Sequence, residues 1–222
     1  KDEFIKYVMN EDISINELMK KAEALNIKVS DKNLVIAAVI DGQGVVSSNS
    51  IIKNSSATDY SVQNIIDEIL SRRGIGECFK LKQGWFIILL DTKDCDQDKE
   101  EVIISLCQEM KTLVNRYVNI NMNFLYSKEE VYLTETGDII DIMVECISES
   151  CYLDGPIIMD ISKCPPIIKA ISYIKRNYTK KISLEDVSDY VYMNKNYFCK
   201  VFKNEVGVTP VEYITNYKME KA

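Results

Sequence analysis

Apolar residues in the first two thirds of the chain occur in short continuous runs that are typical of β-strands. The run at residues 34–40 (LVIAAVI) has no polar position, as expected for a strand buried on both faces. Two later runs are separated by Gln83 and Gly84, which indicates a β-hairpin. The predicted strands are 34–40, 78–81, 85–91, 119–126 and 156–159.

Between these runs the apolar residues recur every three or four positions, which predicts amphipathic helices. From residue 34 onward the order is β-α-β-β-α-β with a central hairpin, the ferredoxin-like split βαβ arrangement. The predicted fold class is therefore α+β, with a ferredoxin-like domain followed by an all-α segment. The helices predicted before that segment are 2–9, 14–25, about 58–74, 98–117 and 139–151.

The last 57 or so residues contain only helical patterns. Ser183 with Asp186 three positions later predicts a capping box at a helix start. Residues 192–194 break the pattern, with Asn194 able to cap a second helix that ends before Gly207. These signals predict a helix-turn-helix. Its apolar stripes are Ile167, Ile168, Ile171, Ile174, Leu184, Val187, Val191, Phe198, Val201 and Phe202.

The polar face of the second helix suggests chemistry. Asn196, Cys199, Lys200 and Lys203 follow i, i+3, i+4, i+7 spacing and so share one side. Amide and ammonium groups on a helix suit the DNA major groove, where they reach base edges and phosphates. The same spacing also fits the solvated face of an ordinary helical hairpin.

The segments YIKRNYTKKISLEDVSDYV, MNKNYFCKVFKNEVGVTPVEYI and YKMEKA extend this pattern to Ala222. Together, residues 167–222 resemble the first helix-turn-helix half of an AraC/XylS-type DNA-binding domain. The chain departs from the family at Ser188, where a small Ala is usual, and at Lys218, where Arg is usual. Domains of this family carry two such units, and the chain includes one, so we expect weak DNA binding.

Transferred position by position, the resemblance implies three base-reading candidates and three phosphate contacts. Asn196 would pair with adenine and Lys200 with guanine, and Cys199 lies between them. The other three would hold the backbone, Asn194 through the helix N-terminus. The base-reading candidates are Asn196, Cys199 and Lys200, and the phosphate candidates are Asn194, Lys195 and Lys203. The expected partner is double-stranded DNA.

The first part of the chain, with the phrase FIKYVMNEDISINELMKKAEALNI, looks like the degenerate GGDEF-like middle domain of YesN-type response regulators. That resemblance implies a receiver domain before Lys1, a sensor kinase and a two-component phosphorelay. It also favours a homodimer, which would place two readers on paired half-sites. The expected domains are a connector at 1–30, the GGDEF-like domain at 31–162 and the helix-turn-helix half at 163–222.

Catalysis is not expected. Active cyclases of the GGDEF type carry a Gly-Gly-acidic-acidic turn in the central hairpin, and FKLKQGWF has one glycine and no carboxylate. Asp41 alone is insufficient as a metal ligand. The absence of histidine excludes Ser-His-Asp and Cys-His sites. We therefore expect no enzyme, cofactor or metal, and seven reduced cysteines packed mostly as small hydrophobic residues.

Charge is divided unevenly along the chain. Residues 165–222 carry a net charge of +4 and the remainder −11, which predicts a basic reader attached to an acidic domain. The apolar runs are too short to span a membrane, so a cytoplasmic location is expected. Two alternatives stay open: a regulator whose middle domain binds a small molecule through Arg72, Arg73 or Trp85, and an interaction module that does not bind DNA.

Overall fold

The computed structural model describes residues 1–10, 13–40, 56–93, 98–149, 158–163 and 166–221. The first part is a mixed α/β unit and the last part is helical, so the α+β class is confirmed. Asp41 and the glycines at 42 and 44 lie outside the described residues. The elements of the first part are α1 Glu3–Val8, α2 Ile15–Ala24, β1 Lys32–Ile40, α3 Ser56–Arg73, β2 Gly76–Lys82, β3 Trp85–Leu90, α4 Lys99–Val118, β4 Met122–Tyr126, β5 Val131–Tyr132, α5 Thr136–Glu149 and β6 Ile158–Asp160.

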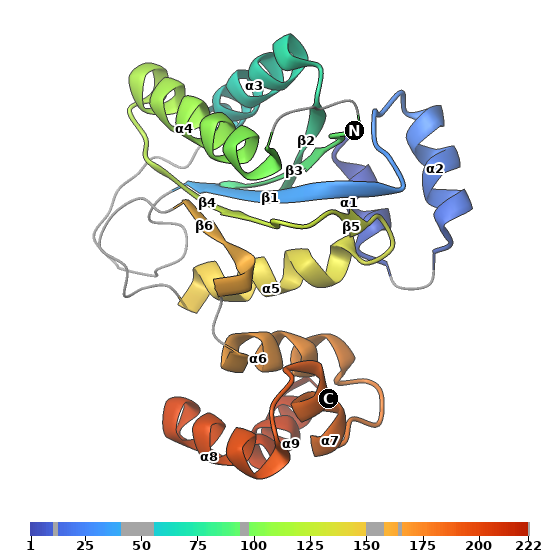
Figure 1. Cartoon of the computed structure of the whole chain (residues 1–222), viewed down its shortest axis with the longest axis vertical. Helices are drawn as coiled ribbons and strands as arrows, with labels where there is room; N and C mark the ends of the chain where they lie inside the picture. Colours follow the sequence, from blue (N-terminus) through green and yellow to red (C-terminus); the bar gives the residue numbers. More distant parts are fainter. Residues whose placement is uncertain (11–12, 41–55, 94–97, 150–157, 164–165, 222) are drawn as a thin grey trace.

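The strands form a sheet in the order β2-β3-β1-β4-β6, with β5 paired to the start of β1 (Figure 1). The central strand β1 pairs antiparallel with β3 and with β4, placing Ile36 between Ile88 and Tyr126. The predicted hairpin is confirmed, because β2 and β3 pair antiparallel around Gly84, whose φ is +70°. Only β6 runs parallel to its neighbour among the described pairings.

Both faces of β1 are buried, as its continuous apolar run predicts. Side chains at even positions such as Ile36 pack under α3 and α4, whereas Val35, Ala37 and Val39 pack on the opposite face with α1, α2 and α5 (Figure 1). Alternate residues of a strand point to opposite faces, so one strand contributes to two cores. Trp85 is only 3% exposed and belongs to the second of these cores.

Several local features differ from the sequence prediction, and β4, for example, begins at Met122 instead of residue 119. The short strand β5, which pairs Asn33 with Val131, has too few residues to produce an apolar alternation. Helix α5 begins at Thr136, three residues before the predicted start. Its first turn has few apolar residues, so apolar periodicity did not show where the helix begins. The N-terminal helices α1 and α2 are not detached: Phe4, Val8 and Leu18 are buried in the same core as β1.

The C-terminal helical unit consists of α6 Pro166–Asn177, α7 Leu184–Tyr190, α8 Lys195–Val206 and α9 Pro210–Lys221. It lies below the sheet unit in Figure 1, with α6 facing α5 and α8 on the far side. No described helix of the chain is both long and apolar enough to cross a membrane.

Candidate nucleic-acid interface

A separate small core holds the helical unit together. Phe198 and Phe202 of α8 are fully buried, and their rings meet edge to face with centroids 5.4 Å apart. They pack against Ile174 of α6 and Val187 of α7. The apolar stripes predicted from the sequence therefore meet in one core, which fixes α8 and leaves its opposite side in solvent.

Capping interactions set the ends of α7. Ser183 Oγ accepts a hydrogen bond from the Asp186 amide at 3.1 Å, and the Asp186 carboxylate accepts one from the Ser183 amide at 2.7 Å. The predicted capping box is confirmed. The Ser183 hydroxyl also donates to the Asp186 carboxylate at 2.7 Å, and this hydrogen bond, together with that from the Ser183 amide, lowers the pKa of Asp186.

Helix α7 ends in a Schellman motif. The Met193 amide donates to the Ser188 carbonyl at 2.9 Å and the Tyr192 amide to the Asp189 carbonyl at 3.0 Å. This places Tyr192 at the left-handed position, with φ +55°, where glycine is the usual residue. A side chain there costs about 1 kcal/mol. Tyr192 is 96% exposed, so packing of its side chain does not offset this strain.

The structure brings the predicted reading residues to one side of α8 but with unequal exposure. Asn196, Lys200 and Lys203 are exposed, whereas Cys199 is half-buried at the edge of the core. Within the described residues, neither Lys200 nor Lys203 forms an ion pair. Lys203 has a longer-range electrostatic interaction with Glu212 of α9, without an ion pair. Two exposed ammonium groups beside an exposed amide are arranged to attract an anionic ligand.

The remaining two candidates are already engaged. Asn194 caps α8 by accepting a hydrogen bond from the Asn196 amide at 3.0 Å, as predicted. Lys195 Nζ lies 2.8 Å from Glu185 Oε1 on α7, and this hydrogen-bonded pair raises the pKa of Lys195. Both partners are largely exposed, so the pair is weak and the lysine can exchange it for a phosphate.

The C-terminal end of α8 and the start of α9 follow the sequence signals. Gly207, with φ +87°, donates its amide to the Lys203 carbonyl. Thr209 and Glu212 form a second capping box, in which the Thr209 amide donates to Glu212 Oε2 at 2.8 Å. Lys218, at the position where the resembled family has Arg, donates to the Lys180 carbonyl at 3.0 Å.

Helix α6 carries the contact between the two units, which the sequence did not reveal. Arg176 Nε lies 2.7 Å from Asp138 Oδ1, and its Nη1 lies 2.9 Å from Asp141 Oδ2. Lys175 Nζ lies 2.8 Å from Glu145 Oε2. The three acids follow i, i+3, i+7 spacing on α5 and so share one face. The row of acids on α5 is visible in the sequence, but the sequence does not show that Lys175 and Arg176 pair with it, because the contact is long-range.

Two further residues tighten this contact. A Cβ atom at Gly137 would lie 3.1 Å from Arg176 Nη2 and 3.1 Å from the Val8 carbonyl, so the absence of a side chain allows the close approach. Tyr190, at the end of α7, packs against Tyr173 with ring centroids 4.5 Å apart and against the core of the sheet unit. Burial raises the pKa of Tyr190 to about 12.

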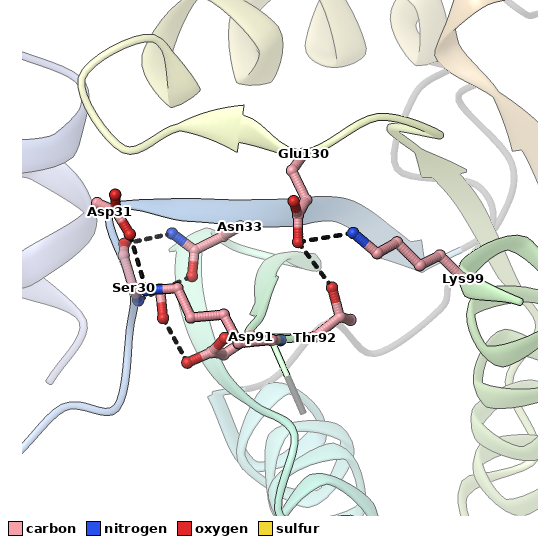
Figure 2. A network of polar contacts seen from close by, with 8 residues as sticks. Ser30, Asp31, Asn33, Asp91, Thr92, Lys99 and Glu130 are labelled. Atoms are coloured by element: carbon pink, nitrogen blue, oxygen red, sulfur yellow. Dashed lines mark hydrogen bonds and ion pairs between the residues drawn. The ribbon is translucent and has the colours of Figure 1, made fainter. Parts of the chain in front are cut away.

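The polar side chains of the sheet unit are largely paired among themselves. Arg72 and Arg73, the candidates for a ligand carboxylate or phosphate, both bind Glu109. The network in Figure 2 joins the ends of β1, β3 and β5 to α4: Asn33 Nδ2 donates to the Ser30 carbonyl at 2.7 Å, and Lys99 lies 2.9 Å from Glu130. Its other members are Asp31, Asp91 and Thr92.

The central hairpin has no metal-binding character. Asp59 is buried, accepts from the Gly84 amide at 3.1 Å and lies 2.7 Å from Lys80 Nζ. It therefore fastens α3 to the hairpin, while Lys82 lies over the Trp85 ring. In the part of the chain that the structure describes, no group of three or more His, Cys, Asp or Glu side chains is arranged to hold a metal.

The cysteines differ from one another. Cys78 and Cys107 are buried and free, as predicted for packed thiols, and burial raises the pKa of the Cys107 thiol to about 12. Cys146 is disulfide-bonded, so the prediction of reduced thiols is wrong for this residue. Sequence spacing gave no indication of it, because no Cys-x-x-Cys pair is present.

Comparison with known proteins supports the helix-turn-helix resemblance. Residues 174–215 match the model for bacterial regulatory helix-turn-helix proteins of the AraC family. The chain is 24% identical over 127 residues to a lactose operon transcription activator of Staphylococcus xylosus, which covers 56% of this chain and 40% of that protein. It is 25% identical over 107 residues to an uncharacterized response regulatory protein of Staphylococcus epidermidis, covering 44% of this chain and 43% of that protein.

The family match covers α7, α8, the last turn of α6 and the first half of α9, elements that all contribute to the small core. The resemblance to AraC-type regulators is confirmed. The chain spans less than half the length of these curated relatives.

Proposed function

We propose that this protein is a sequence-specific DNA-binding transcription regulator that inserts α8 into the major groove. The observation that carries the proposal is the exposed face of α8, where Asn196, Lys200 and Lys203 lie in solvent and neither lysine forms an ion pair among the described residues. This face belongs to the segment that matches an AraC-family helix-turn-helix. The relatives are named as a transcription activator and a response regulatory protein, and neither name denotes an enzyme.

In this proposal the residues of α8 have distinct roles. Asn196 and Lys200 read base edges, the amide pairing with adenine and the ammonium with guanine. Lys203 and Lys195 bind phosphates, with Lys195 leaving Glu185 to do so, and the N-terminus of α8 at Asn194 adds a favourable dipole. Cys199, which is half-buried, contacts a base only through its outer edge.

A salt titration tests the proposal. Binding of the whole chain to a labelled random-sequence DNA duplex is expected to fall steeply with salt concentration, because each phosphate contact releases counterions. Changing Lys195, Lys200 and Lys203 to Ala together is expected to make the slope shallower by about 2, because two of the three, Lys195 and Lys203, are assigned to phosphates. Lys169→Ala, on α6, is the matched control. Absence of salt-dependent binding at low salt would contradict the proposal.

We further propose that the protein is the effector part of a two-component response regulator, with a cytoplasmic location. The sheet unit would be a degenerate GGDEF-like domain at 31–162, preceded by a connector at 1–30 and followed by the reader at 163–222. The strand order β2-β3-β1-β4 supports a ferredoxin-like arrangement. A receiver domain, a sensor kinase and a homodimer are its implied partners. A monomer at high concentration by light scattering would contradict the homodimer.

A second candidate is a regulator whose sheet unit binds a small molecule. A groove of about 400 Å³ between α3 and α4 favours it, since Ile65, Leu113 and Tyr117 give it apolar walls and Arg72 lies at its end. A thermal-shift screen with sugars, sugar phosphates and carboxylic acids tests this candidate. A stabilising compound whose effect disappears in Tyr117→Ala would support it, and no hit would count against it.

A further inference from the structure

Two tyrosines of the helical unit are exposed without any packing that explains them. Tyr192 is 96% exposed at the turn before α8, and Tyr197 is 62% exposed in the first turn of α8. Tyrosine is enriched at binding interfaces, because its ring packs against a partner while its hydroxyl forms a hydrogen bond. The exposed rings of Tyr192 and Tyr197 are therefore available to contact a partner.

The position of Tyr197 relates it to the lysine face. Residues three or four apart on a helix are neighbours on its surface, so Lys200 has Asn196 on one side and Tyr197 on the other. The opposite side of α8 is occupied by Phe198 and Phe202 in the core. The outward arc of α8 is therefore centred on Lys200, with Tyr197 inside it and the half-buried Cys199 at its edge.

Tyr192 stands out because of its backbone. It occupies the left-handed position of the Schellman motif, where glycine would be free of strain, and its side chain gains almost no burial. It precedes Asn194, the N-cap of α8, by two residues and so lies at the end of α8 that approaches DNA in a helix-turn-helix complex. Folding alone does not account for a tyrosine here.

We propose that Tyr192 and Tyr197 are DNA contacts. Tyr192 packs against the sugar–phosphate backbone at the start of α8, and Tyr197 packs on the strand beside the base that Lys200 reads, each hydroxyl donating to a phosphate oxygen. This inference rests on the proposed function. Duplex DNA is the favoured occupant because two exposed lysines that form no ion pair within the described residues share this face, and the surrounding segment carries a net charge of +4.

The decisive variant is Tyr192→Gly, for which stability and binding change in opposite directions. Relief of the left-handed strain is expected to raise the urea midpoint of unfolding. Loss of the ring is expected to weaken binding of the whole chain to a labelled random-sequence duplex about tenfold. The salt slope is expected to stay unchanged, because a tyrosine releases no counterion, whereas Lys203→Ala, which removes a phosphate contact, should make it shallower.

Tyr197→Ala is expected to weaken binding about tenfold, and Tyr197→Phe by a smaller factor, since it keeps the ring. Tyr60→Ala is the control: Tyr60 is 68% exposed but lies on α3 in the acidic unit. If Lys200→Ala weakens binding and both tyrosine variants bind like wild type, the tyrosine proposal alone is overturned. If wild type shows no salt-dependent binding, the tyrosine proposal and the proposed function are both overturned.

Discussion

Helices α6 and α8 belong to the same small unit and both carry basic residues, but their charges are used differently. On α6, Arg176 is 11% exposed at its side chain and is held between Asp138 and Asp141. On α8, Lys200 is exposed and has no acidic partner among the described residues. The difference comes from the neighbours: α5 presents a row of carboxylates to α6, whereas α8 lies on the side of the helical unit away from α5 (Figure 1) and Lys200 on it is exposed.

This comparison separates positioning from binding. A basic side chain that is buried against acids fixes how two units sit on each other, and losing it leaves those acids uncompensated. A basic side chain in solvent contributes little to stability and remains available to a polyanion. We therefore expect substitutions on α6 to alter folding and substitutions on α8 to alter DNA binding.

The largest expected effect on stability is that of Arg176→Ala. It removes both ion pairs and leaves Asp138 and Asp141 beside a void, which we expect to cost about 2 kcal/mol, less than a fully buried pair because both acids are partly exposed. Urea unfolding monitored by circular dichroism measures it. Lys200→Ala, the control from the other helix, is expected to leave the midpoint unchanged. Equal midpoints for the two variants would contradict the inferred difference between the basic residues of α6 and α8.

The next effect concerns α8 alone. Lys200→Ala is expected to cost about 1–3 kcal/mol of binding to a selected operator and to relax specificity at one base pair. Lys203→Ala is expected to weaken all sequences similarly and to reduce the salt slope by about 1. Competition with single-base operator variants distinguishes the two. A uniform loss for Lys200→Ala would show that it contacts phosphate only.

Local features of the fold could be predicted from the sequence, whereas long-range pairings could not. The capping box at Ser183, the break at 192–194 and the apolar stripes on α6 to α8 are local signals, and local hydrogen bonds and periodicity determine them. The same holds for the strand at 34–40, since only a doubly buried strand needs an unbroken apolar run. Elements of this kind were predicted nearly to their ends.

Long-range pairings were not predictable in this way. Neither the α5–α6 ion pairs nor the Lys195–Glu185 pair follows from spacing, because each joins residues brought together by the tertiary fold. Likewise, the half-burial of Cys199 depends on the rotation of α8 about its own axis relative to the core of the helical unit. Helical periodicity identified the reading face, but which residue at its edge stays exposed required the packed structure.

A smaller effect on stability is expected from the capping box at the start of α7. Ser183→Ala removes the hydroxyl that accepts from the Asp186 amide, which we expect to cost about 1 kcal/mol of stability. Urea unfolding measures the loss, with Ser162→Ala, outside the helical unit, measured beside it. If the loss approaches that of Arg176→Ala, surface caps matter as much as the α5–α6 contact.

The smallest effect is a pH dependence of the capping boxes. The pKa of Asp186 is lowered by hydrogen bonds from Ser183, and that of Glu212 by hydrogen bonds from Thr209. A lowered folded-state pKa means that the stabilisation is present above the unfolded-state value and is lost as the pH falls through the folded-state value. The stability of the helical unit should therefore decrease below about pH 4.

Urea midpoints measured between about pH 5 and about pH 3 test this. Ser183→Ala should show a smaller decrease than wild type, because Asp186 then lacks its hydroxyl partner. Identical decreases would mean that other carboxylates, such as Glu130 with its pKa lowered by Lys99, govern the acid response.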